Sequence, residues 1–417
     1  MRKRNSLWSY EEKPKQVIEV EEKHVKVRFV LMIVCIVVAM IAIGIWLYGL
    51  LTVEPGWYSI SANVSENHCG NEFSFAYEVG ASGMDGKTEK AAVTKIYSKA
   101  CKEAYDLFTW DVEDPVQTGI RYVSDHPNQV VAVDPRLYKA LALVKDSRLL
   151  YMGAVNAEYA KLFLIPEEQL AALYDPAQNP DKKAFITELM GYVGSDSHIR
   201  LEMLGENKVR LYVSAAYLNY ALANDITAFL DFGWMKNAFI IDMLAEELNA
   251  KGYTRGYISS FDGFERYLAA EDVQYSRPVY DRFENGINRP GLYSVKGGGS
   301  RVFFRNYPLV DEDRWHYYSF PSTGTIASVY VDPTDGICKS ATDNLVVYSR
   351  EASCGELVLT CAHLFLTEVL DESALVNLNA EGISAIWAEG KELRHTGEDL
   401  SVTVPEDSGY TLKHISE

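Results

Sequence analysis

The stretch TIASVYVDPTDGICKSATDNLVVYSREASCGELVLTCAHLFL, from Thr325 to Leu366, decides the fold. Its first residues, 325–331, are rich in β-branched side chains and predict a strand. The run Asp332-Pro333-Thr334-Asp335-Gly336 has the composition of a turn, and the apolar run 344–349 predicts a second strand. Helical periodicity follows, so the stretch predicts the order strand, turn, strand, helix.

The helix at the end of this stretch is amphipathic by spacing. Glu356, Thr360 and His363 fall on one face, whereas Leu357, Val358, Leu364 and Phe365 can face a core. Two oxygen side chains on one face, near a turn that carries Asp332, could bind a hard cation such as Mg²⁺. A solvated helix face, with the threonine bonded to its own backbone, explains the same spacing.

Three segments of the stretch resemble the C-terminal signature of the FAD:protein FMN transferases, the ApbE-like flavin transferases. The run 329–336, VYVDPTDG, resembles the family segment H-x-I-D-P-x-T-G, with Val329 in place of the histidine. The strand 345–348 and the run 355–361, GELVLTC, resemble the strand S-V-T-V and the helix A-D-A-L-A-T-A that follow it. In this resemblance Glu356 replaces the metal-binding aspartate, and Thr360 keeps the hydroxyl.

A second stretch, LDFGWMKNAFIID (230–242), is similar to the family segment L-D-L-G-G-I-A-K-G-Y-A-V-D. Asp231, Gly233 and Asp242 are in register. Trp234 occupies the place of the second glycine and Asn237 that of the lysine, while Lys236 lies one position early. A glycine at a helix N-terminus lets backbone N–H groups approach a pyrophosphate, and Trp234 narrows that approach.

Further along, 260–264 resembles the family's N-x-G-G-D but keeps a single glycine, and Asn156 stands where the family has an aspartate. The resemblance covers about 73–400, and its departures from the family pattern cluster in the site. It assigns catalysis to Asp332 and Asp231, and Mg²⁺ binding to Glu356 and Thr360. The expected contacts to FAD are Gly233, Trp234, Asn237, Asp262, Gly263 and Val329.

An apolar segment precedes this domain. Residues 29–53 carry no charge, and at about 1.5 Å per residue they are long enough to cross a bilayer. A cleaved signal peptide fits less well, because the apolar run is about twice the usual length and no small-x-small site follows. Lys23, Lys26 and Arg28 before the run place residues 1–28 in the cytoplasm by the positive-inside rule, and 54–417 outside.

The charge distribution argues against a nucleic-acid partner. Residues 1–28 carry eight Lys/Arg against five Glu, so the rest of the chain is more acidic than the total of −18. An acidic domain repels phosphate backbones. Five of the six cysteines lie beyond the apolar segment, where an outer location permits disulfides without specifying any.

These patterns predict an α+β domain, with a mixed or mainly antiparallel sheet, behind a single transmembrane helix. Two functions remain open. The first is a membrane-anchored transferase that uses Mg²⁺ to move FMN from FAD onto a Thr or Ser of an acceptor protein. The second is a relative that has lost the transfer and serves as a nucleotide-binding or envelope interaction module, since a fold does not carry function by itself.

Overall fold

The computed structural model describes residues 25–51, 53–64, 68–112, 114–283, 286–310, 313 and 315–416. They form two units, Met1–Val53 and Glu54–Glu417. The first contains helix α1 (Val25–Leu51), in which Lys26–Gly44, with mean hydropathy 2.8, is long and apolar enough to cross a membrane. The expectations for residues 1–24 lie outside the described part of the chain.

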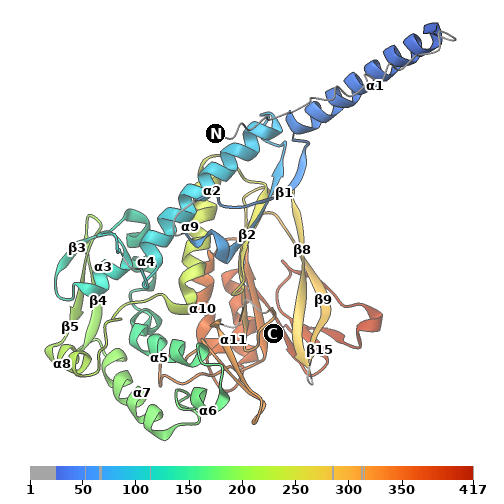
Figure 1. Cartoon of the computed structure of the whole chain (residues 1–417). Coiled ribbons are helices and arrows are strands. Elements are labelled where there is room, and N and C mark those ends of the chain that lie inside the picture. The colour runs from blue at the N-terminus through green and yellow to red at the C-terminus, as the bar shows by residue number, and fades with distance from the viewer. Residues whose placement is uncertain are drawn as a thin grey trace, which may run out of the picture. The chain divides into compact units, whose positions relative to one another are not determined.

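The second unit is built around a nine-stranded sheet, which matches the predicted α+β class (Figure 1). All neighbouring strands in it are antiparallel except β15 and β17, which are parallel. In sheet order the strands are β1 (Gly56–Ile60), β2 (Phe73–Val79), β6 (Gly256–Ser260), β7 (Phe264–Tyr267), β10 (Gly299–Arg305), β13 (Asn344–Ser349), β14 (Ile383–Glu389), β15 (Glu392–His395) and β17 (Thr411–His414).

Both faces of this sheet are covered. Helices α2 (Gly86–Phe108), α9 (Lys236–Ala250) and α10 (Cys354–Phe365) lie on one face, and β8 (Gln274–Phe283) and β9 (Gly286–Lys296) lie over the other (Figure 1). β16 (Ser401–Thr403) completes that second sheet, in the order β16-β9-β8. The double cover explains why all six residues of β13 are buried, since a strand buried on both faces is apolar without alternation.

The deciding stretch divides between two sheets, which the sequence did not predict. Strand β12 (Thr325–Ser328) is shorter than the expected 325–331 and pairs with β11 (Tyr317–Phe320) in a separate hairpin. β13 instead pairs with β10 and β14 at the centre of the large sheet. Between them, Val331 and Cys338 form an isolated bridge around the predicted Asp-Pro turn.

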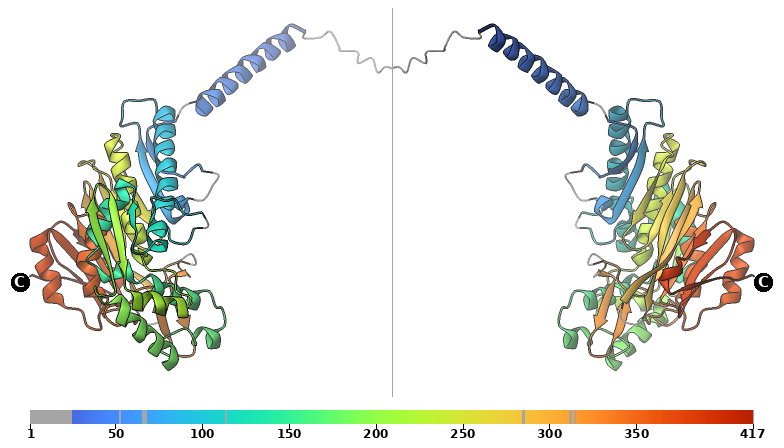
Figure 2. Two further views of the ribbon diagram at one scale, coloured as in Figure 1. Left: turned by 90° about the vertical axis from the view of Figure 1, so that its left-hand side faces the viewer. Right: turned by 90° about the vertical axis from the view of Figure 1, so that its right-hand side faces the viewer.

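A lobe of helices and a further three-stranded sheet, ordered β3-β5-β4, lies beside the helical face of the large sheet (Figure 2). In this lobe β4 and β5 form a hairpin that turns at 205–207, and Asp134 caps the helix that begins at Pro135. The lobe comprises α3 (Ile120–Asp125), β3 (Val130–Ala132), α4 (Pro135–Val144), α5 (Gly153–Phe163), α6 (Glu168–Ala171), α7 (Pro180–Val193), β4 (Ile199–Gly205), β5 (Lys208–Val213) and α8 (Ala215–Ala223), and α11 (Glu372–Asn377) follows α10.

Candidate functional site

A cavity of about 440 Å³ lies at the N-terminus of α9. Its walls come from far-separated segments, because α9, α5, the turn after β6 and the segment before β11 meet there. Six of the ten predicted site residues line it: Asp231, Gly233, Trp234, Asn237, Asp262 and Val329. The fold therefore brings together most of the residues that the resemblance assigns to FAD, together with one of the two predicted catalytic aspartates.

Asp231 lies at the entry to α9. Burial raises the pKa of its carboxyl group, although hydrogen bonds from the Gly233 N–H and the Asn156 amide, and the charge of Lys236, favour the ionised form. Gly233 has φ +54°, and a Cβ on it would collide with the Asn156 side chain. Glycine is therefore required here both by the backbone conformation and by the close approach of Asn156.

The side chain of Lys236 contributes an ammonium group to the lining of the cavity. Its Nζ lies 2.9 Å from Oε2 of Glu72, which ends the 3₁₀ turn η1 (Cys69–Glu72). Although burial opposes the charge, this ion pair raises the pKa of Lys236. The cation that the resemblance expects at position 237 is thus present one residue earlier, but a carboxylate already neutralises it.

Asn237 and Asp262 also line the cavity. The Nδ2 of Asn237 donates to Oδ2 of Asp262 at 2.9 Å, and burial raises the pKa of Asp262 while the charge of His316 lowers it. His316 lies directly beside Val329, whose backbone N–H donates to the His316 carbonyl at 3.0 Å. An imidazole therefore lines the cavity next to the position where the resemblance expects one.

A buried ion pair holds two of the cavity's walls together. Arg305 on β10 contacts Oδ2 of Asp313 at 2.9 Å and donates to the carbonyl of Phe261 at 2.8 Å. Both charged side chains are essentially inaccessible, at 1% and 0% exposure. Since Phe261 precedes Asp262 and Asp313 lies close before His316, this pair positions both of those residues.

Five of the residues that line the cavity each have one polar side-chain atom that is buried without a hydrogen-bond partner among the described residues. Such atoms each cost roughly 1–3 kcal/mol when they stay unsatisfied. They are Thr109 Oγ1, Trp110 Nε1, Asn237 Oδ1, Asp262 Oδ1 and His316 Nδ1. Their concentration around one cavity, which includes donors as well as acceptors, favours a site for a polar ligand.

Asp332 and Gly263 lie outside this lining. The Asp332 carboxylate accepts hydrogen bonds from Thr334 and pairs with Lys339 at 2.9 Å. Burial would raise the pKa of Asp332, but these contacts outweigh it and hold the pKa below the usual range. Gly263 has φ +109°, and a Cβ there would meet the carbonyl oxygen of Phe303. The local contacts of both residues are those of turn-forming positions.

Glu356 lies in a different setting from the cavity residues. Its side chain accepts from the Ser353 N–H at 2.8 Å, and its own N–H donates to the Ser353 hydroxyl at 3.2 Å. This reciprocal pair is a capping box at the start of α10. Glu356 lines a second cavity of about 680 Å³, and Thr360 is half-buried one turn further along α10. Their metal-binding role remains a prediction.

Aromatic packing lies between α10 and the first cavity. The ring centroids of Trp234 and Tyr330 are 5.0 Å apart, and those of Tyr330 and Phe365 of α10 are 5.2 Å apart. Phe304 contacts all three rings. Among the described residues no group of three or more His, Cys, Asp or Glu is placed to bind a metal.

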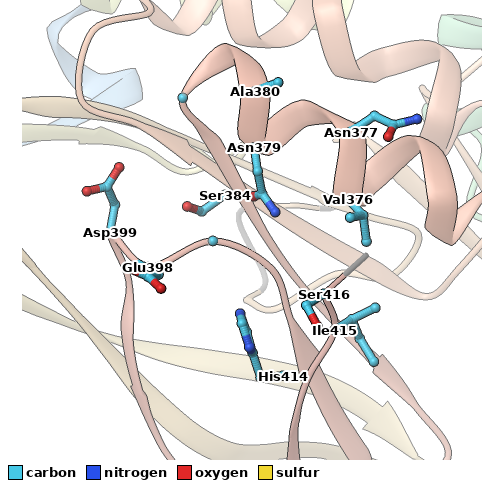
Figure 3. Close-up of a pocket in the computed structure, with 12 residues that line it drawn as sticks. Val376, Asn377, Asn379, Ala380, Ser384, Glu398, Asp399, His414, Ile415 and Ser416 are labelled. Atoms are coloured by element: carbon cyan, nitrogen blue, oxygen red, sulfur yellow. The ribbon is translucent and has the colours of Figure 1, made fainter.

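A third cavity, of about 750 Å³, lies near the C-terminal end of the chain (Figure 3). Its lining comes from residues 376–416 and contains none of the predicted site residues. The polar side chains of Glu398, Asp399 and His414 around it are exposed to solvent. It is a solvated hollow next to the edge strand β17.

Sequence reasoning missed several groups in the site. Glu72 and His316 were not singled out, because only the folded chain brings them to α9. Asn156 and Lys236 stand beside or at matched positions of the resemblance, which gives neither of them a role. The capping box was visible in the sequence, since Ser353 precedes Glu356 by three residues, which is the usual pattern of that motif.

No family model matches the sequence, and no curated protein does. Among solved structures, the ApbE protein from Thermotoga maritima aligns with a TM-score of 0.55 at 14% identity, covering 84% of this chain and 97% of that one. The flavin transferase ApbE from Vibrio cholerae and a point variant of it give TM-scores of 0.48 and 0.47 at 12% and 13% identity. They cover 85% and 84% of this chain and 98% and 97% of theirs.

The likeness to the Thermotoga protein shows the fold. The chain has one apolar N-terminal helix followed by an ApbE-like domain of mixed α and β structure.

Proposed function

We propose that this chain is a membrane-anchored flavin-transferase-like protein that binds FAD in the cavity at the N-terminus of α9. The observation that carries the proposal is the set of five unpartnered buried polar atoms around one cavity, in an ApbE-like fold. Lys236 and Asn237, in the first turn of α9, line this cavity, and a helix N-terminus favours anionic groups such as a pyrophosphate. Aromatic side chains, among them Trp110, Trp234 and Trp315, offer flat surfaces for a ring system.

The transfer that the resemblance implies has simple chemistry. The hydroxyl oxygen of an acceptor Thr or Ser forms a bond to the FMN phosphorus, and the bond from that phosphorus to AMP breaks. Asp231 is the proposed base that takes the hydroxyl proton, since it is a carboxylate within the cavity wall. Lys236 would stabilise negative charge on the phosphates once its contact with Glu72 loosens.

Mg²⁺ belongs to the proposed reaction only through the resemblance. Among the described residues no cluster of three possible metal ligands is present. Such a site could bind Mg²⁺ only through one or two carboxylates together with the phosphates of the substrate. We therefore assign no catalytic step to the metal.

The second candidate is a nucleotide-binding or interaction module without transfer activity. Two observations favour it: Asn237 is engaged by Asp262 where the family has a lysine, and Glu356 is engaged in a helix cap. The two functions share the ligand and differ in the chemistry.

The test is a comparison of binding and transfer in the purified full chain. FAD or ADP at a hundred times its Kd should stabilise the folded state by about 2.7 kcal/mol and raise the melting temperature. FMN attached to a Thr-containing acceptor peptide, detected by mass spectrometry, would establish the transferase. Binding without transfer would establish a nucleotide-binding module, and no thermal shift at millimolar FAD would contradict both the transferase and the nucleotide-binding module.

A further inference from the structure

Cys69 and Cys101 lie against each other in the interior of the domain. Cys69 begins the turn η1, Cys101 lies on α2, and both are 0% exposed. The Sγ of Cys69 lies 3.1 Å from the Cys101 carbonyl oxygen. The neighbouring Cys101 side chain and burial raise the pKa of the Cys69 thiol. The fold thus brings together two thiols that are 32 residues apart in the sequence.

The remaining described cysteines of the outer domain lie against oxygen atoms or within apolar packing. Cys338 contacts the Ser328 hydroxyl at 3.2 Å, and Cys354 donates to the Glu265 carbonyl at 3.3 Å. Cys361 is buried on α10. The odd number of cysteines in this domain therefore resolves into one contacting pair and three separate thiols.

We propose that Cys69 and Cys101 form a disulfide bond when the domain lies on the oxidising side of the membrane. Each thiol gives up its proton, and the two sulfurs together give two electrons to a protein or glutathione disulfide, which leaves as two thiols. The two sulfurs must approach to about 2.05 Å, and the Sγ atom of Cys69 already lies 3.1 Å from the backbone carbonyl oxygen of Cys101. The proposal depends on the outer location of the domain and does not depend on flavin transfer.

The bond would fix one wall of the cavity. Glu72 is the last residue of η1, and it pairs with Lys236 at 2.9 Å. A covalent link from Cys69 to α2 holds the turn that carries this carboxylate. The oxidised protein should therefore keep the Glu72 contact with Lys236 more firmly than the reduced protein does.

The experiment maps disulfides in the full chain isolated in membranes. Free thiols are blocked with N-ethylmaleimide in denaturant without reductant, and the digest is read by mass spectrometry. We expect a peptide that links Cys69 to Cys101, and alkylation of Cys338, Cys354 and Cys361. N-ethylmaleimide on both Cys69 and Cys101 would overturn the proposal.

Variants supply the controls. Reductant should lower the melting temperature of the parent by roughly 5 °C, because the bond closes a loop of about thirty residues. The double variant Cys69→Ala/Cys101→Ala should lose that response, whereas Cys361→Ala should keep it. An equal response to reductant in the double variant would also overturn the proposal. Protease accessibility in the same membranes separates a failed disulfide from a wrong location of the domain.

Discussion

At the scale of single residues, the cavity holds its cation in a closed ion pair. Lys236 is only 21% exposed and lies between Glu72 and the rest of the lining, in which Asp231 and Asp262 add further carboxyl groups. A ligand phosphate must compete with Glu72 for the ammonium group. Affinity for an anionic ligand is therefore set by the strength of this one pair.

Glu72→Gln should strengthen the binding of ADP or FAD. Removal of the carboxylate frees Lys236, and we expect the Kd to fall by about threefold to tenfold, which corresponds to about 0.7–1.4 kcal/mol. Lys236→Gln should weaken binding by at least as much. Isothermal titration measures both, with Glu78→Gln as a control, since Glu78 pairs with Arg255 and is not part of the lining. Weaker binding by Glu72→Gln would contradict this account.

Ser353 and Glu356 allow a capping role to be separated from metal binding. Ser353→Ala breaks the capping box and should lower the free energy of unfolding by about 1 kcal/mol. Glu356→Gln keeps a side chain that can cap and should change it by less than about 0.5 kcal/mol. Denaturant titration gives both values.

If Glu356 binds metal, Glu356→Gln should have a larger effect than Ser353→Ala on nucleotide binding, although it has the smaller effect on stability. Glu356→Gln would then abolish any Mg²⁺-dependent part of nucleotide binding, while Ser353→Ala would leave it intact. The capping role predicts that neither substitution changes that part.

At the scale of elements, Asp242 joins α9 to α10. Its carboxylate accepts from the N–H groups of Cys354 and Gly355, each at 2.9 Å, and so caps α10 from the neighbouring helix. Burial raises the pKa of Asp242 to about 6, despite the nearby charge of Arg266. The connection between the two helices is therefore sensitive to pH.

The stability of the parent relative to Asp242→Asn should fall as the pH rises. A raised carboxyl pKa means that the folded state binds the Asp242 proton more tightly than the unfolded chain does. The resulting stabilisation of the folded state is complete below about pH 4 and disappears as the pH rises through about 6. The lost difference in free energy of unfolding amounts to about 2–3 kcal/mol. Urea titrations of both proteins between pH 4 and 7 measure it, and a constant difference would refute the linkage.

Local patterns predicted most of the elements, because periodicity and caps act within a few residues. The strand expected at 344–349 and the α10 face with buried Leu357 both agree with the structure. The pairing of strands could not be predicted, since partners far apart in the chain set it: β12 pairs with β11, whereas β13 pairs with β10 and β14. The resemblance in sequence predicted those site residues that lie within its matched segments. Glu72 and His316 lie outside these segments, and only long-range packing brings them to the site.

At the scale of the whole molecule, the expected topology concerns the two units. Helix α1 is long and apolar enough to cross a membrane, and basic residues precede it in the sequence. We propose that Glu54–Glu417 lies outside and residues 1–28 inside.

Protease added to intact cells should therefore digest the domain after Glu54 and leave an epitope on residues 1–20 protected. Immunoblots against both ends follow the outcome, and detergent-lysed cells serve as the control in which the epitope is also lost. Digestion of the epitope in intact cells would reverse the orientation.

Three of the chain's seven tryptophans, Trp110, Trp234 and Trp315, line the same cavity. An indole's emission depends on its immediate surroundings, so a large part of the protein's intrinsic fluorescence originates at the walls of the proposed site. An isoalloxazine ring seated among these indoles would absorb their emission by energy transfer, whereas ADP would change it only slightly. A fluorimeter could thus distinguish a flavin from a plain nucleotide in this cavity without any label, and Trp234→Phe would show how much of the signal comes from α9.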